Sequence, residues 1–317
     1  MSELCIIIPV FNEERNLAEL HARLSDTASQ LEIPVVFLFI NDGSHDRTQE
    51  IIEHLALTDS RIRYLSFSRN FGHQIAVSAG IDHAFAEYVA IIDGDLQDPP
   101  ETLIPMYMKL QEGLDVVYAK RRRRKGESFM KKFTAKVFYR MLKRMTSVSI
   151  PVDTGDFRIM RQKVVAVLRS MPEQHKFIRG QIAWAGFRQG FVEYDRDGRR
   201  SGKTSYTYGK MTRFAADGIT SFSDFPLKLV TWSGFVVAVL SFIVAIYALY
   251  SKFILGGAVP GWASLMISLL FLGGVQLLSI GIMGEYISRI ASNVRKRPLY
   301  IVDVKKVDQE AECKTAP

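Results

Sequence analysis

Apolar runs alternate with helical patterns over the first 120 residues of the chain. The runs have the length of buried strands, and they read LCIIIPV, VVFLFI, RIRYLSF, YVAIID and DVVYA. The segments between them, at 16–31, 46–57 and 73–85, repeat apolar residues with the period of an amphipathic helix. Strands that alternate with helices favour a parallel sheet with helices on both faces. The pattern therefore predicts an α/β fold.

The last third of the chain contains two apolar stretches without a charged residue. One lies between Lys228 and Lys252, and the other lies between Lys252 and Glu285. Each supplies the roughly 20 apolar residues that cross a hydrocarbon core of about 30 Å. The stretches predict two transmembrane helices joined by a hairpin at 251–261. A pair of buried core helices is the alternative.

Basic residues flank these stretches on their outer sides. The hairpin contains only Lys252, whereas the outer flanks carry Arg213, Lys228, Arg289, Arg295, Lys296 and Arg297. By the positive-inside rule, both termini are expected in the cytoplasm and the protein is expected to be integral to the cell membrane. The N-terminus, MSELCIIIPV, reads as a first strand and not as a signal peptide.

Charge and composition narrow the class of partner. The net charge of +8 and the pI near 9.4 favour nucleic acid, lipid headgroups or a phosphorylated substrate. Two predicted membrane spans beside basic segments favour lipid phosphate over nucleic acid. Two cysteines cannot form a disulfide framework or a cysteine metal site, which suits a reducing compartment. The six histidines show no spacing that converges on a metal.

Polar residues gather where the predicted strands end. Asn12 and Glu14 follow the first strand, Asp42 follows the second, and Asp93 and Asp95 follow the fourth. Ligands of parallel sheets bind at the carboxyl ends of the strands. Asn12 is also expected to cap the next helix. The glycine motifs of Rossmann dehydrogenases and of P-loop NTPases are missing from the sequence, so another device must hold any nucleotide.

The two aspartates around Gly94 supply such a device. Asp93 and Asp95 can both reach one Mg²⁺ or Mn²⁺ ion, which takes oxygen ligands from carboxylates and substrate phosphates. The spacing alone is weak, because Asp195 and Asp197 repeat it in what reads as a solvated loop. The first copy differs in its context, since it follows a buried strand and has a glycine on which the chain can turn.

Several segments together resemble family-2 glycosyltransferases of the polyprenyl-phosphate type. They are IIIPVFNEE, FINDGS, SFSRNFGHQIAVSAG, IIDGDLQDPP, TGDFRIM and FLGGVQLLSIGIMGEYISR. The similarity runs from about residue 4 to 302 and is greatest to the bacterial bactoprenol glucosyltransferases, relatives of dolichyl-phosphate mannose synthase. It implies a GT-A catalytic domain, Rossmann-like with a mainly parallel sheet, followed by interfacial helices and two transmembrane helices. It also implies a nucleotide-sugar donor, a divalent metal and an inverting transfer to polyprenyl phosphate.

The resemblance sets the expected organisation of the chain. A cytoplasmic GT-A domain is expected at 1–208, a juxtamembrane helical segment at 209–228, a two-helix transmembrane hairpin at 229–287 and a cytoplasmic basic tail at 288–317. A homo-oligomer packed through the membrane helices is also implied, and glycine pairs at 256–257 and 273–274 would permit close helix contact.

The resemblance assigns a donor site as well. The residues expected to bind the nucleotide sugar are Pro9, Asn12, Glu14, Asp42 and Asp93, with Asp42 on the uracil or ribose. The residues expected on the metal and the donor diphosphate are Asp93, Asp95 and Gln97.

Asp156 is expected to face the reacting sugar, with Arg158 nearby and Asp95 as the third catalytic residue. The acceptor is a phosphate monoester whose second pKa is near 6, so it is mostly ionised and hardly needs a base. Asp156 is therefore expected to position the sugar or to stabilise positive charge at C1. A structural cap in the loop before FRIM is the alternative.

Cations are expected to hold the lipid phosphate. A basic run at 120–125 follows the fifth strand, and a second basic loop lies at 199–205. The expected ligands are Arg121, Arg122, Arg124, Arg199 and Lys203. Lys203 is a substitute, because Ser205 stands where relatives commonly carry a lysine. Between these regions, residues 129–145 place an apolar stripe among basic residues, as in an interfacial helix or in a helix buried in the core.

The leading hypothesis is transfer of glucose from UDP-glucose to undecaprenyl phosphate at the cytoplasmic membrane face. Mannose, galactose or a modified arabinose would fit the motifs as well. A non-catalytic, membrane-anchored nucleotide-sugar sensor or scaffold is the alternative from another class, although four acids retained at strand ends argue against it. A processive polysaccharide synthase would carry a QxxRW motif, which the sequence lacks.

Overall fold

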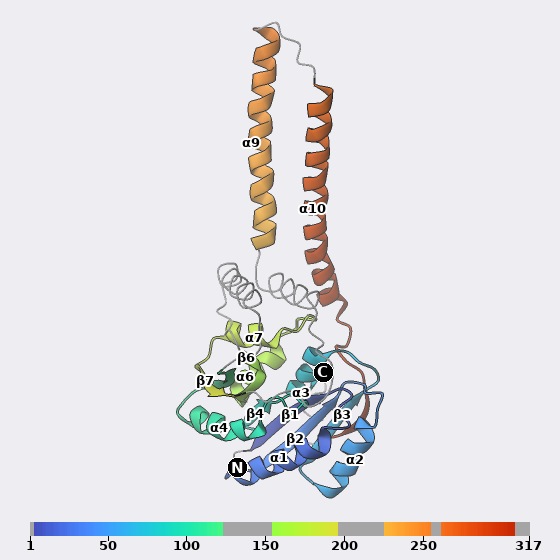
Figure 1. Cartoon of the computed structure of the whole chain (residues 1–317), viewed down its shortest axis with the longest axis vertical. Coiled ribbons are helices and arrows are strands. Elements are labelled where there is room, and N and C mark those ends of the chain that lie inside the picture. Colours follow the sequence, from blue (N-terminus) through green and yellow to red (C-terminus); the bar gives the residue numbers. More distant parts are fainter. Residues whose placement is uncertain (1–2, 123–153, 196–224, 255–260, 308–317) are drawn as a thin grey trace.

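The computed structural model describes residues 3–122, 154–195, 225–254 and 261–307 (Figure 1). The basic residues Arg124, Arg199 and Lys203 and the expected interfacial helix at 129–145 lie outside these ranges. Most of the expected juxtamembrane segment at 209–228 also lies outside them.

The described residues form one mixed sheet of eight strands in the order β7-β5-β6-β4-β1-β2-β3-β8. Its central strands are parallel, which confirms the α/β prediction. They are β1 (Leu4–Val10), β2 (Val35–Asn41), β3 (Ile62–Phe67) and β4 (Tyr88–Ile91). The other four are β5 (Val116–Arg121), β6 (Thr154–Arg161), β7 (Gln189–Tyr194) and β8 (Val302–Lys306).

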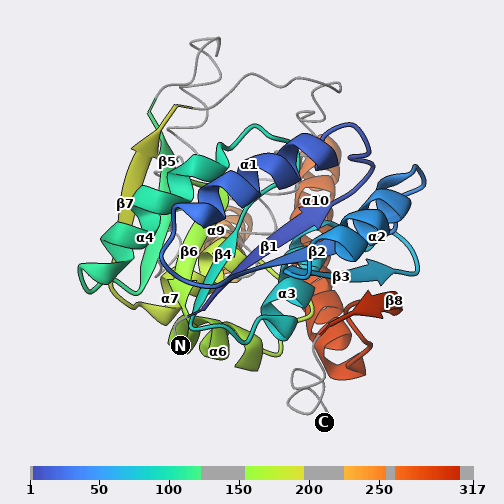
Figure 2. The ribbon, with the colours of Figure 1, turned by 90° about the horizontal axis from the view of Figure 1, so that it is seen from below.

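Helices cover both faces of this sheet, as predicted (Figure 2). On one face, α1 (Leu17–Ser29), α2 (Thr48–Thr58) and α4 (Leu103–Gln111) pack against side chains such as Ile6 and Ile8. On the other face, α3 (His73–His83), α6 (Gln162–Ser170) and α7 (Ile178–Ala185) pack against Cys5 and Ile7. A short 3₁₀ helix, η1 (Pro100–Thr102), precedes α4. Burial of both faces explains why β1 reads as an unbroken apolar run.

The TGDFRIM segment is a strand, so the alternative of a structural cap in a loop before FRIM is wrong. It forms β6, which lies antiparallel between β4 and β5. Asp156 and Arg158 stand inside this buried strand, and neither caps a helix. The strand could not be predicted from its sequence, because two charged residues at alternate positions are not typical of a buried strand. The pair is tolerated because Arg158 Nη2 lies 2.7 Å from Asp156 Oδ1.

Part of the expected basic tail at 288–317 joins the sheet. β8 pairs antiparallel with β3 at the edge of the sheet, and Ser68 N–H donates to the Ile301 carbonyl oxygen at 3.1 Å. The Tyr300 ring stacks on Phe67 with their centroids 5.1 Å apart, and its hydroxyl donates to Asp82 at 3.2 Å. Residues 300–306 are therefore fastened to the sheet that begins with β1.

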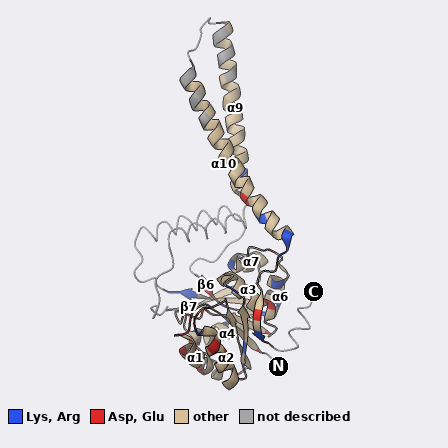
Figure 3. Cartoon of the chain, turned by 90° about the vertical axis from the view of Figure 1, so that its right-hand side faces the viewer, with Lys and Arg blue, Asp and Glu red and all other residues tan. Residues whose placement is uncertain are grey.

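Two long helices extend from one end of the domain as a pair (Figure 1). They are α9 (Phe225–Phe253) and α10 (Trp262–Arg295), and their windows Phe225–Val244 and Phe271–Arg295 are long and apolar enough to cross a membrane. No part of either window is buried inside the protein, which argues against the alternative of core helices. The charged residues of α10 lie near its domain end (Figure 3).

We predict that Tyr300→Ala lowers the stability of the protein by about 2 kcal/mol, because it removes a stacked ring and a hydrogen bond to the partly buried carboxylate of Asp82. Tyr300→Phe removes only the hydrogen bond and should cost about 1 kcal/mol. Thermal unfolding of the detergent-purified protein measures both. Leu57→Ala, at a side chain that is 85% exposed, is the control. An unchanged midpoint for Tyr300→Ala would show that the C-terminal segment does not stabilise the domain.

Candidate active site

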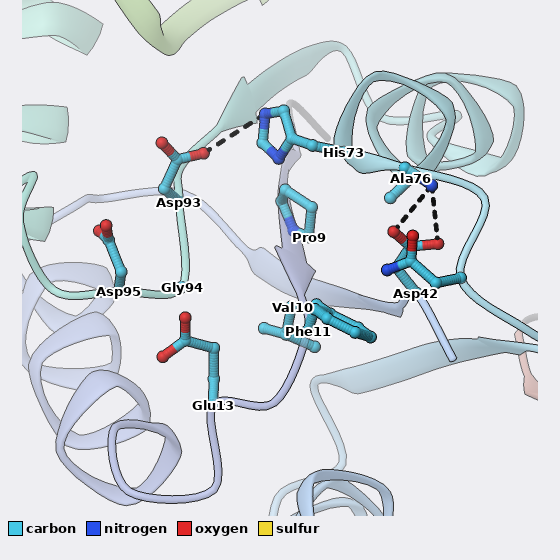
Figure 4. A pocket seen from close by; sticks show the side chains of 12 residues that line it. Pro9, Val10, Phe11, Glu13, Asp42, His73, Ala76, Asp93, Gly94 and Asp95 are labelled. Atoms are coloured by element: carbon cyan, nitrogen blue, oxygen red, sulfur yellow. Dashed lines mark hydrogen bonds and ion pairs between the residues drawn. The ribbon is translucent and has the colours of Figure 1, made fainter. Parts of the chain in front are cut away.

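A pocket of about 280 Å³ lies at the carboxyl ends of β1, β2 and β4 (Figure 4). It is lined by Pro9, Val10, Phe11, Glu13, Asp42, Asn70, Gly72, His73, Ala76, Asp93, Gly94 and Asp95. The polar clusters that follow the predicted strands therefore meet at one edge of the sheet, as parallel strands require.

Two of the expected nucleotide ligands support the pocket's rim instead of lining it. Asn12 Oδ1 accepts the His45 N–H at 2.9 Å, and Glu14 Oε2 accepts the Arg47 N–H at 3.2 Å. Their neighbour Glu13 lines the pocket. The expectation that Asn12 caps a helix is wrong, because Asn12 has a left-handed φ of 56° and α1 begins only at Leu17.

Asp42 lines the pocket and also fixes the loop that forms its far wall. The buried carboxylate accepts the Phe71 N–H at 2.7 Å and the Gly72 N–H at 3.0 Å. Burial raises the pKa of Asp42, although these two amides act to lower it. Asp42 thus holds residues 70–72 against the pocket, and its contact with uracil or ribose stays a prediction.

Asp93 and Asp95 project into the pocket from either side of Gly94 (Figure 4). A Cβ at Gly94 would lie 2.8 Å from Val10 Cγ1 and 3.3 Å from the Pro9 carbonyl oxygen, so glycine is required for this close approach to β1. Gly94 therefore serves to keep the acidic loop tight against the sheet.

The two aspartates fit a divalent cation. Asp93 Oδ1 is buried and accepts no hydrogen bond from the described residues, and burial together with Asp156, Asp98 and Asp95 raises the pKa of Asp93 to about 6. A cation would relieve this cost. No group of three His, Cys, Asp or Glu side chains with metal-site geometry occurs in the described ranges, so donor phosphates and water would complete the coordination. Gln97 donates its backbone N–H to Asp95 Oδ1 at 3.1 Å, and its role as a ligand stays a prediction.

Asp156 is surrounded by donors from three elements. Its Oδ1 lies 2.7 Å from Arg158 Nη2 and 3.0 Å from Arg179 Nε. Its Oδ2 lies 3.1 Å from His73 Nε2, 3.1 Å from Gln74 Nε2 and 3.2 Å from Arg179 Nη2. The side chain is only 8% exposed. All its oxygens are therefore occupied by N–H groups of the protein.

These contacts set the charges at the site. Burial alone would raise the pKa of Asp156, but Arg179, His73 and Arg158 outweigh it and hold that pKa well below its usual range. Burial disfavours the charged form of His73, yet its bond to Asp156 and its proximity to Asp93 raise the His73 pKa to about 9. Asp156 is thus ionised at neutral pH and has too little proton affinity for a general base.

The sequence analysis missed three residues of this cluster. His73 and Gln74 begin α3 directly after the pocket-lining Gly72, and the rule that placed the acids at strand ends would have indicated them. Arg179 carried no local signal, since only the packing of α7 brings it to β6.

The described members of the first basic run are engaged with protein acids. Arg121 Nε donates to the Tyr194 hydroxyl at 3.3 Å, and its Nη2 lies 4.0 Å from Asp98 Oδ1. Arg122 is exposed and lies 3.7 Å from both Glu193 and Asp195. Their contact with lipid phosphate stays a prediction, as it does for Arg124, Arg199 and Lys203.

Comparison with known proteins places the chain in a family. The sequence profile of glycosyl transferase family 2 matches residues 5–169. The chain belongs to glycosyl transferase family 2. A second profile, the GtrB C-terminal hairpin, matches residues 225–290 of this glycosyltransferase, which cover α9 and most of α10. The resemblance seen in the sequence is thereby confirmed.

Relatives match this glycosyltransferase over nearly their whole length. An uncharacterized glycosyltransferase of Synechocystis sp. is 47% identical over 95% of this chain and 94% of its own. A prophage bactoprenol glucosyl transferase homolog of Escherichia coli is 41% identical over 95% and 98%, respectively. The bactoprenol glucosyl transferase of Shigella phage SfV is 40% identical over 96% and 99%.

The similar solved structures include a synthase at low sequence identity. Glucosyl-3-phosphoglycerate synthase of Mycobacterium tuberculosis, in complex with Mn²⁺, UDP-glucose and phosphoglyceric acid, aligns with a TM-score of 0.46 at 16% identity. The alignment covers 69% of this chain and 77% of the synthase.

We predict that Asp156→Asn lowers the pKa of His73 from about 9 towards the ordinary value of about 6.5, because the variant removes the charge that stabilises the imidazolium. NMR titration of the metal-free protein with labelled histidines measures this, and His73→Gln identifies the signal. His83, which contacts the Ala79 carbonyl oxygen, is the internal control. An unchanged His73 pKa would show that Asp156 does not stabilise its charge.

Proposed function

We propose that this glycosyltransferase transfers a hexose, glucose from UDP-glucose in the first instance, to polyprenyl phosphate at the cytoplasmic membrane face with inversion at C1. The observation that supports the proposal most is that the Asp156 carboxylate is ionised and fully hydrogen-bonded. The carboxylate expected beside the reacting sugar is fully hydrogen-bonded and ionised, so it does not take a proton from an acceptor hydroxyl. An acceptor that is already an anion needs no such base.

The donor half of the proposal rests on the acidic loop. Asp93 and Asp95 would hold Mg²⁺ or Mn²⁺ against the diphosphate of the donor, at the edge where Asp42 and Phe11 leave room for a nucleotide. When bound, the ion supplies positive charge for the diphosphate as it leaves. The protein keeps Asp93 and Asp95 fixed by packing Gly94 on β1, so that the leaving group is aligned before reaction.

The acceptor half rests on the hairpin and on the relatives. Helices long and apolar enough to span a membrane extend from the domain that carries the pocket, and relatives at about 40% identity are named bactoprenol glucosyl transferases. A lipid phosphate embedded in the membrane is the acceptor that suits both. Because α9 begins and α10 ends at the same domain, both outer ends of the hairpin lie on one side of a membrane (Figure 1). We assign that side to the cytoplasm, because basic residues flank the outer ends of the helices.

A sensor that binds nucleotide sugar without turnover explains the site less well. Such a protein needs a nucleotide pocket, but it does not need the buried Asp156 carboxylate with its two arginines. It also does not need a histidine that contacts Asp156 and lies 3.7 Å from Asp93. That arrangement costs desolvation energy, which a reaction at the site would justify.

We predict that purified protein with Mn²⁺ or Mg²⁺, undecaprenyl phosphate and radiolabelled UDP-glucose yields label that extracts into organic solvent, and that EDTA abolishes it. Asp95→Asn should reduce the rate by at least about 100-fold because the ion loses a ligand. Asp26→Asn, at an exposed position on α1, should not change the rate.

A panel of other UDP- and GDP-sugars tests the identity of the donor. Label from a different sugar would correct the donor and keep the reaction. If no sugar labels the lipid while the folded protein still binds UDP, the sensor explanation replaces the transferase.

A further inference from the structure

We propose that Arg179 and His73 form the binding site for the phosphate group of the acceptor, with Asp156 holding both side chains in place. This inference rests on the proposed function and names residues of that same site. It assigns to the cluster around Asp156 a ligand that is anionic and arrives from the membrane side.

The first step is the balance of charge around Asp156. Two guanidinium groups, those of Arg158 and Arg179, contact one carboxylate, so the three groups carry a net positive charge. His73 adds a ring nitrogen 3.1 Å from the same carboxylate. One cation balances the charge of one carboxylate, so the second guanidinium leaves the cluster positive, and a positive cluster attracts an anion.

The second step is accessibility, which separates the two arginines. Arg158 is completely buried and holds Asp156 and the backbone of its own strand, so no substrate can reach it. The Arg179 side chain is 25% exposed and that of His73 is 43% exposed, and His73 lines the donor pocket. Arg179 and His73 therefore both keep surface that a substrate can reach, and His73 offers it inside the pocket.

The third step is the direction from which the acceptor comes. Arg179 belongs to α7, and α7 lies at the end of the catalytic domain from which α9 and α10 extend (Figures 1 and 3). The same short helix exposes Trp184 to 63%, and tryptophan favours the boundary between water and lipid. A lipid phosphate that enters from the membrane would thus meet Arg179 before it meets the acidic loop.

The fourth step is the position relative to the donor. His73 Nε2 lies 3.1 Å from Asp156 Oδ2 and 3.7 Å from Asp93 Oδ1, so it stands between the expected metal site and the cationic cluster. An acceptor phosphate on Arg179 and His73 would be next to a donor whose diphosphate lies at Asp93. The planar fork of Arg179 is also the side-chain group that best matches phosphate oxygens.

Arg179→Gln tests the site with two separate readouts. We expect the KM for undecaprenyl phosphate to rise at least about tenfold, because a charge-assisted contact is lost. The affinity for UDP with Mn²⁺, measured by calorimetry, should not change. His73→Gln should raise the same KM, and Arg179→Lys should raise it less, since it keeps the charge and loses the fork.

Arg169→Gln is the matched control. Arg169 stands on the neighbouring α6 and donates to the carbonyl oxygens of Ile81 and Ala84, away from the pocket. Its replacement removes a partly buried arginine and should change neither the KM for undecaprenyl phosphate nor the affinity for UDP. Thermal unfolding of all variants separates a loss of fold from a loss of binding, and Arg179→Lys provides a folded variant if Arg179→Gln unfolds.

Two outcomes would overturn the inference while the wild-type protein still labels the lipid. If Arg179→Gln also lowers the affinity for UDP, the Arg179 guanidinium binds the donor diphosphate and not the acceptor. Recovery of the acceptor KM in the double variant Asp156→Asn/Arg179→Gln would show that Arg179 only neutralises Asp156. Failure of the wild-type protein to label any lipid would instead refute the proposed function.

Discussion

Burial of the Asp156 carboxylate inside β6 is the constraint on which the active site depends. An ionised carboxylate away from water must be matched by cations and hydrogen-bond donors, and removal of one partner from such a cluster costs about 3–5 kcal/mol. The partners come from the same strand, from α3 and from α7. One charge therefore ties together three elements that are far apart in the sequence. The site and the fold around it stabilise each other.

The sequence predicted the parts of the fold whose signals are local. Strands β1 to β5 and helices α1 to α3 follow the apolar runs and helical patterns closely, because both faces of a parallel sheet are buried. β6 was not predicted, because the charges of Asp156 and Arg158 neutralise each other only in the folded chain. β8 was not predicted either, because its residues are mostly exposed and its pairing with β3 joins segments about 240 residues apart.

The candidate site shows the same division. Asp42, Asp93 and Asp95 could be placed from sequence, because each directly follows a strand and the carboxyl ends of parallel strands share an edge. Asn12 and Glu14 were assigned to the pocket but hold the loop at 45–47, since one step along a turn exchanges the side chain that faces inward. The contact of Arg179 with Asp156 arises only from the packing of α7 against β6, and no pattern in the sequence predicts this packing.

The separation of charge in the site agrees with a reaction between two anionic substrates. Acidic groups line the pocket, where a divalent ion would turn their negative charge into net attraction for a diphosphate. Cationic groups stand at Asp156, where a second phosphate would otherwise be repelled by the same acids. His73 contacts both groups, at 3.7 Å from Asp93 and 3.1 Å from Asp156. The segment after α10 is fastened to the sheet through Tyr300 and β8, so the domain end of α10 is held to the same sheet on which the candidate site is built.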